Sequence, residues 1–350
     1  MQGVRHVYPP PPIISCTGKN EAAKPARISL YDNLKFVLIL SVVVGHFIDI
    51  KSSQSNYYKS IFVYIYTFHM PLFLFLSGLF HKNENILQKT LTFICIGFML
   101  KITFFLFGIF LYGKASFSFL SDSGIPWYMF VLAIYIALSY GLRNIDKRFI
   151  LFFSLMLGCF VGYDAKIGDY LYISRTVVFY PFFVLGMMAD KERLMQLTRK
   201  KWLRGCAVTV LCLWLVLCFS RLEHIYSLRP LFTGRNPFKV NGLFVKWGFA
   251  YRILCYAITC AVGFSIVCVV TNRKLTPITL FGSRTLYVYF WHWPVAMVLQ
   301  KYGIATALCE SREGKFMWIL CAVATTFCLS LKIFSFPVAQ TAKFCKYARS

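Results

Sequence analysis

Three histidines inside apolar stretches are the first residues whose placement suggests chemistry. His46 lies deep in the run YDNLKFVLILSVVVGHF, His69 precedes a proline in TFHMPLFLFLSG, and His292 lies in FGSRTLYVYFWHWPV. Polar side chains in such surroundings face protein or water rather than lipid. Histidine also suits proton transfer near neutral pH. These positions predict an acid–base site, although a single histidine is as typical of a packing contact between helices.

The first of these runs carries four polar side chains with helical spacing. Lys35 and His46 are eleven positions apart. At about 100° per residue this is close to three turns, so both lie on one face, roughly 16 Å apart along the axis. Asp32 is within about 40° of this stripe, and Asp49 lies one turn beyond His46. Snorkelling explains a single lysine, but the aligned set favours a site in which Asp49 orients His46.

The composition identifies the elements that must position these residues. Of 350 residues, 58% are hydrophobic and 15% charged, against roughly 45–50% and about 25% in soluble domains. The fold class predicted is therefore all-α integral membrane, with about ten transmembrane helices. The apolar runs fall near 34–50, 61–80, 91–112, 126–142, 149–163, 174–190, 204–220, 247–270, 278–299 and 316–336. Pro71, within the second run, predicts a kink and room for a cavity.

The charge pattern predicts the orientation. The net charge of +25 comes from basic residues clustered in short loops, which is typical of membrane topology rather than of nucleic-acid binding. Their bias places the N- and C-termini in the cytoplasm. Residues 1–28 are expected to be a disordered cytoplasmic tail, 29–340 the membrane domain and 341–350 a short cytoplasmic tail. The thirteen cysteines contain no CxxC pair, so neither a metal site nor a disulfide framework is expected.

Five stretches occur in an order that resembles the acyltransferase-3 family. They are the opening from Arg27 to His46, FHMPLFLFLSG, PWYMFVLAIY, SRTVVFYPFFVLG and SRTLYVYFWHWPV. The chain looks most similar to the fucose-4-O-acetylase-like, polysaccharide-modifying branch. The resemblance implies a multi-pass enzyme of the bacterial plasma membrane, with no bound cofactor. It would move acetyl from acetyl-CoA to a hydroxyl of a cell-surface or lipid-linked carbohydrate, with membrane lipid as its other partner.

The resemblance also implies roles for individual residues. The basic residue and histidine of the family motif match Lys35 and His46, which makes His46 the leading general base. One departure is the segment HKNENILQKT, which lacks the Arg-x-x-Arg pair of many members. Other cations must then share the task of binding the acetyl-CoA donor. The expected sets are catalytic His46, Asp49 and His69; donor-binding Lys35, Asp32, Lys101 and Arg284; and acceptor-binding or supporting Trp127, Arg175 and His292.

Two other classes remain open. A transporter or exporter of a glycan or lipid-linked sugar also suits many spans and buried charges, but no inverted repeat is evident. A membrane scaffold would not need the Lys35–His46 stripe. The longest outer loop, 221–246, mixes Arg, Lys, Tyr and Phe. Such a loop is suited to stacking on sugars and pairing with phosphates, and equally to being a solvated loop.

Overall fold

The computed structural model describes residues 28–121, 124–164, 166–235, 238 and 244–347. Within them the regular elements are helices, and the one pairing of extended backbone is an isolated bridge between Ser121 and Tyr170. The all-α prediction is thus confirmed for the described part of the chain. The expected N-terminal tail lies outside it, apart from Ile28.

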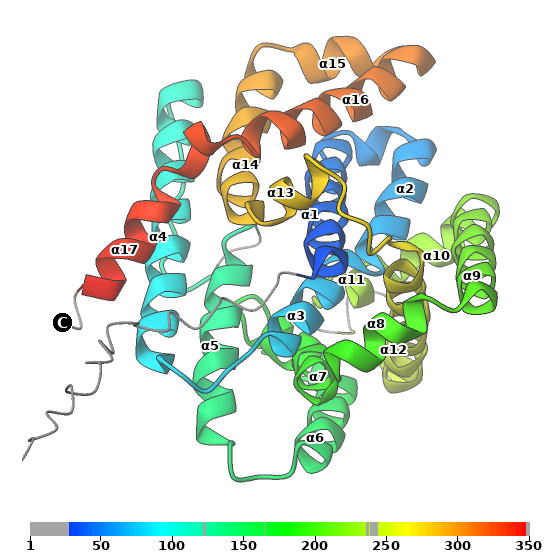
Figure 1. Ribbon diagram of the computed structural model, residues 1–350. Helices are drawn as coiled ribbons and strands as arrows, with labels where there is room; N and C mark the ends of the chain where they lie inside the picture. The colour runs from blue at the N-terminus through cyan, green and yellow to red at the C-terminus, as the bar shows by residue number, and fades with distance from the viewer. Residues whose placement is uncertain (1–27, 122–123, 165, 236–237, 239–243, 348–350) are drawn as a thin grey trace, which may run out of the picture.

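Figure 1 shows the helices in chain order, and their bounds follow. They are α1 Ser29–Asp49, η1 Ser52–Gln54, α2 Asn56–Tyr66, α3 His69–Leu79, α4 Ile86–Tyr112, α5 Trp127–Gly141, α6 Lys147–Phe160, η2 Val161–Tyr163, α7 Ile173–Met188, α8 Lys191–Thr198, α9 Lys201–Ser220, α10 Leu222–Ser227, α11 Arg229–Phe232, α12 Phe244–Val269, α13 Ile278–Gly282, α14 Thr285–Lys301, α15 Ile304–Cys309, α16 Arg312–Leu329, η4 Lys332–Ser335 and α17 Val338–Tyr347.

Ten membrane spans were predicted, but fewer helices of the described residues are long and apolar enough to cross a membrane by themselves. In the described residues five qualify: α1, α2 with α3, α4, α9 and α12. A sixth is added if α7 and α8, bent by 90°, count as one span. The other predicted runs correspond to α5, α6, α14 and α16, which are shorter or less apolar. Ten spans and cytoplasmic termini therefore stay predictions.

The second predicted run is broken, but not at its proline. α2 ends at Tyr66 and α3 begins at His69, so Pro71 occupies the first turn of α3. Proline is tolerated there because its missing N–H would have no intrahelical acceptor. The break lies two residues upstream of the predicted kink, and it sets His69 at a helix start.

α1 is the central helix of the molecule. It packs against α2, α3, α13, α14 and α16, and Figure 1 shows it between α14 and α2. Its most apolar stretch is 72% buried inside the protein, against 17% for α9 at the periphery. A helix enclosed by other helices tolerates polar side chains because they meet protein or cavities instead of lipid.

Asn33 fixes the position of α14 relative to α1. Its side-chain amide donates to the carbonyls of Thr271 and Arg273 at 2.8 and 2.9 Å, and its oxygen accepts from the Thr279 hydroxyl at 2.7 Å. The backbone of α13 lies so close to α1 that a Cβ on Gly282 would overlap a carbonyl oxygen of α1. These contacts hold the segment before α14 in register and so determine where His292 lies.

The C-terminal residues also adopt helical structure. α17 covers most of the expected tail 341–350 and packs on α4, where the Thr341 hydroxyl lies 2.9 Å from the sulfur of Met99. The side of the membrane on which this helix lies stays a prediction.

The crossing of α3 and α7 depends on two glycines. A Cβ on Gly78 would overlap the carbonyl oxygen of Phe183, and one on Gly186 would overlap that of Phe75. Because both obstacles are backbone atoms, the helices must separate to admit a methyl group. Gly186→Ala should therefore lower the free energy of unfolding by about 2–3 kcal/mol, measured by thermal or denaturant unfolding of the purified protein in detergent.

Gly263→Ala is the matched control for this substitution. Gly263 is buried in α12, yet a Cβ there would have no heavy atom within 4 Å. The alanine should be neutral or slightly stabilising, since alanine favours helix over glycine. Equal unfolding midpoints for both alanine variants would contradict the close α3–α7 packing.

Candidate functional site

A cavity of about 770 Å³ lies at the end of α1 that carries His46. Its wall is built from α1, α2, α3, α4, α5, α7, α11 and α14, with further residues from the segments before α5 and α7 and after α11. Among the residues that line it, the polar side chains and tryptophans are His46, Asp49, Tyr66, His69, Trp127, Asp169, Arg175, Arg229, Thr233, Arg235, Tyr289 and Trp293. A half-enclosed space with converging titratable groups is the form that active sites take.

His46 contributes a half-buried imidazole to this cavity. Its Nδ1 lies 3.4 Å from the hydroxyl of Tyr66. The ring of His292, from α14, is 5.4 Å away centre to centre, and that of Trp293 is 6.0 Å away. The structure thus brings together two of the three predicted histidines directly, from helices far apart in the chain.

The hydrogen bonds of the other two histidines define their tautomers. His69 Nδ1 lies 2.9 Å from the carbonyl of Ile65, and His292 Nδ1 lies 3.0 Å from that of Val288. A carbonyl oxygen only accepts, so each Nδ1 carries a proton and each Nε2 of the neutral ring is an acceptor. His292 is fully buried, and its Nε2 has no hydrogen-bond partner among the described residues.

In the described structure Asp49 forms no hydrogen bond or ion pair with His46. Its carboxylate accepts from Arg229 at 2.9 Å and from the Ser52 hydroxyl at 2.9 Å. The predicted role of Asp49 in orienting His46 therefore has no support in the geometry, because Tyr66 occupies the position next to His46 Nδ1. Asp49 instead joins the end of α1 to α11.

Arg229 is a site residue that sequence reasoning missed. It lay in the outer loop 221–246, and only the fold brings it to Asp49, 180 positions away. The guanidinium also donates to the Tyr226 hydroxyl at 2.8 Å and lies 4.3 Å from the ring centre of Phe62. Residues 236–237 and 239–243 of that loop lie outside the described residues.

The predicted acceptor or supporting residues Trp127 and Arg175 lie side by side in the cavity wall. Arg175 is 3% exposed, and its guanidinium lies 5.0 Å from the ring centre of Trp127 and 3.5 Å from the carboxylate of Asp169. Trp127 in turn stacks on Phe179. A buried guanidinium at a cavity wall provides fixed donors for developing negative charge.

A second cavity, of about 220 Å³, contains Lys35. The Lys35 ammonium lies 3.5 Å from Asp32 and 5.1 Å from the ring centre of Phe80, and the Lys191 ammonium lies 4.5 Å from the same ring. Met70 and Tyr289 line both this cavity and the one that contains His46. The two spaces therefore meet at these side chains, from opposite ends of α1.

The structure does not bring Lys101 or Arg284 to either cavity. The buried Lys101 ammonium donates to the carbonyls of Ser118 and Phe119 at 2.7 and 3.0 Å. Arg284 donates to the carbonyl of Ser330 at 3.1 Å. Both were predicted to hold the donor, and both instead bind backbone oxygens of neighbouring segments.

The comparisons with known proteins give one family match. Residues 29–334 match a family model described as an acyltransferase domain, Acyl_transf_3. No curated protein and no solved structure matches. The matched range includes α1 to α16 and both cavities.

Proposed function

Because the chain belongs to the acyltransferase-3 family, we propose that it transfers an acetyl group from acetyl-CoA to a hydroxyl of a cell-surface or lipid-linked carbohydrate. It would act in the bacterial plasma membrane. The observation that carries the proposal is the pair of cavities that open at opposite ends of α1 and meet at Met70 and Tyr289. Such an arrangement suits a donor and an acceptor that approach from different sides.

The smaller cavity suits the thioester arm of the donor. It is narrow and largely apolar, with Ser77 and Tyr128 hydroxyls 3.2 Å apart in its wall. Lys35 and Lys191 flank Phe80 at one end. Two ammonium groups beside an exposed aromatic ring offer charge for phosphates and a face for a base. In this proposal Lys191 binds the donor phosphates, which is the role that the resemblance assigns to the Arg-x-x-Arg pair.

The larger cavity suits the acceptor and the chemical step. His46 Nδ1 donates to the Tyr66 hydroxyl in the productive tautomer, which leaves Nε2 as the base. Nε2 takes the proton of the sugar hydroxyl while the oxygen attacks the thioester carbonyl. The tetrahedral oxyanion then collapses, the C–S bond breaks, and the departing thiolate takes the proton from His46. The products are the O-acetyl ester and coenzyme A.

The oxyanion requires a hydrogen-bond donor, which the neutral tautomers of His69 and His292 do not offer. Both rings use their N–H on a backbone carbonyl and present Nε2 as an acceptor. Arg175 remains, since it is always charged and lies in the cavity wall. His69, which lines the cavity, then holds the acceptor hydroxyl, and the buried His292 packs against the base His46.

Tyr66 is proposed as a positioning residue for His46. Tyr66→Phe removes its hydroxyl and should lower kcat about tenfold, which is the value of one modest hydrogen bond, while KM for acetyl-CoA stays unchanged. Steady-state kinetics on purified protein measures this split. A fall in donor affinity with kcat intact would assign Tyr66 to binding instead.

Radiolabelled acetyl-CoA tests the proposal as a whole. Purified protein in lipid nanodiscs is incubated with [acetyl-¹⁴C]acetyl-CoA and a bacterial surface polysaccharide that has been chemically de-O-acetylated. Label should appear in the polysaccharide as an alkali-labile ester. If the protein instead moves intact glycan across liposomes without forming an ester, it is a transporter.

A further inference from the structure

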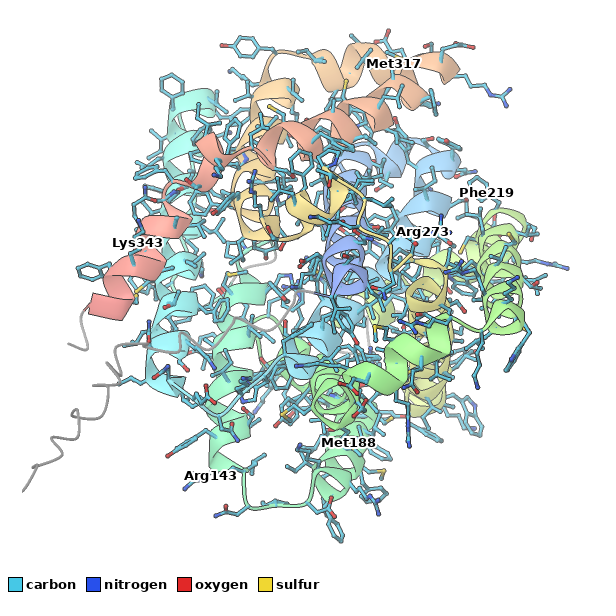
Figure 2. The ribbon with its side chains drawn as sticks, viewed as in Figure 1. Arg143, Met188, Phe219, Arg273, Met317 and Lys343 are labelled. Atoms are coloured by element: carbon cyan, nitrogen blue, oxygen red, sulfur yellow. The ribbon has the colours of Figure 1, made fainter. Side chains whose placement is uncertain are left out.

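A third and larger cavity lies outside the two that the proposed reaction uses. It is an open groove of about 1470 Å³ between α2, the end of α9 with α10, and the start of α16. Figure 2 shows two of its lining residues, Phe219 on α9 and Met317 on α16, at the outer edge of the molecule. This volume exceeds the roughly 300–1,000 Å³ of usual small-molecule sites, so the groove has room for an extended ligand.

The groove carries more cations than carboxylates. Lys59, Arg221, Arg312 and Lys315 line it, and in the described residues none of the four forms a salt bridge. Its two carboxylates, Glu223 and Glu313, lie in the first turns of α10 and α16. There they are stabilised by the positive ends of those helices. The cations are therefore available to an anionic ligand.

Aromatic rings lie between these charges. Tyr57, Phe219 and Phe316 line the groove with 41%, 44% and 55% of their surfaces exposed. Tyr57 and Phe219 lie 6.0 Å apart, centre to centre, and so join α2 to α9. Exposed ring faces among polar groups offer stacking surfaces for the apolar faces of sugar rings.

Tyr226 separates the groove from the cavity that contains His46. Its side chain lines the groove, while its hydroxyl accepts from Arg229 and its ring contacts Phe62, both of which line the His46 cavity. The Lys59 ammonium lies 5.6 Å from the centre of the same ring. One side chain therefore lies between the groove and the site where the hydroxyl would react.

We propose that this groove binds an anionic carbohydrate, namely the phosphate- or carboxylate-bearing residues that flank the sugar to be acetylated. The inference deepens the proposed transfer reaction and rests on it for the identity of the occupant. Charge-assisted hydrogen bonds from Arg221, Arg312 and Lys315 hold the anionic groups. The exposed rings hold the neighbouring sugars, and the chain enters the His46 cavity past Tyr226.

Direct binding tests the groove without any transfer. The full chain in detergent micelles is titrated with glucose 1-phosphate and with methyl α-glucoside, its neutral counterpart, by saturation-transfer NMR or calorimetry. Glucose 1-phosphate should bind about tenfold more tightly, and Arg221→Gln with Arg312→Gln should remove that difference. Phe316→Ala should weaken the binding of glucose 1-phosphate but not that of inorganic phosphate. Lys332→Gln, an exposed cation outside the groove, is the matched control.

Three outcomes would overturn the inference. Equal binding of the charged and neutral sugars removes the role of the cations, and equal binding of inorganic phosphate and glucose 1-phosphate removes that of the rings. Displacement of the sugar phosphate by phosphatidylglycerol in nanodiscs makes the groove a lipid site. His46→Gln should bind glucose 1-phosphate as the wild type does. A variant that binds the sugar phosphate but does not transfer acetyl separates failure of the proposed reaction from failure of binding in the groove.

Discussion

His46→Gln is expected to lower the rate of acetyl transfer by about 10²–10⁴-fold, which is the usual contribution of a general base. Glutamine fills similar space and keeps a hydrogen bond to Tyr66, but its amide cannot take the proton of a sugar hydroxyl. Acetyl-CoA binding should be unchanged because His46 does not line the cavity that contains Lys35. The measurements are ester formation under single-turnover conditions and donor affinity by calorimetry.

Two further variants make the result specific. His46→Ala removes the packing against His292 and Trp293 as well, so it should lose both activity and some thermal stability. His81→Gln changes a histidine that lines neither cavity and bonds Ser139 and Asn83, and it should keep the rate. Wild-type transfer by His46→Gln would exclude His46 as the base.

The periodicity of α1 made one half of the candidate site predictable. Because 3.6 residues form a turn, eleven positions bring Lys35 and His46 onto one face without any knowledge of the fold. The helix and both of its cavities agree with that expectation. The wall of the His46 cavity was predictable in part, since Trp127 and Arg175 were both candidate site residues and both line it.

The remaining contacts depend on tertiary structure that no local pattern encodes. Arg229 meets Asp49 across 180 positions, and Lys191 reaches Phe80 from the start of α8. Both were surface loop cations in the sequence. Lys101 shows the converse, because a lysine within an apolar run resembles a site residue until its three carbonyl acceptors are seen.

The number of membrane spans stays a prediction, because an apolar run in the sequence does not separate length from burial. Apolar runs near α5, α6, α14 and α16 resemble full spans in the sequence, but these helices have only 14 to 18 residues in the described structure. The break between Tyr66 and His69, for example, lies inside a single apolar run of the sequence. Hydrophobicity therefore predicts that a segment is buried, and it leaves open whether lipid or protein surrounds it.

Combined loss of Lys35 and Lys191 is expected to weaken acetyl-CoA binding about 10²-fold, since each charge-assisted phosphate contact is worth roughly tenfold or more. The Lys35 and Lys191 ammonium groups lie 5.1 and 4.5 Å from the centre of a single ring, Phe80, which lines the smaller cavity. Lys191→Ala leaves intact the hydrogen bond from Tyr31, which uses the backbone carbonyl of residue 191. Calorimetry with acetyl-CoA at low and high salt measures the loss and its electrostatic origin.

Arginine and a loop lysine provide the controls for this double substitution. Lys35→Arg with Lys191→Arg keeps both charges and should keep part of the affinity, because arginine binds phosphate with a different geometry. Lys89→Ala removes a half-buried cation of the segment HKNENILQKT, whose ammonium binds the carbonyl of Lys82, and should have no effect. The contrary result is that Lys89→Ala alone weakens acetyl-CoA binding while the double alanine variant binds acetyl-CoA normally. The donor phosphates would then bind at that loop, and the smaller cavity would lose its proposed ligand.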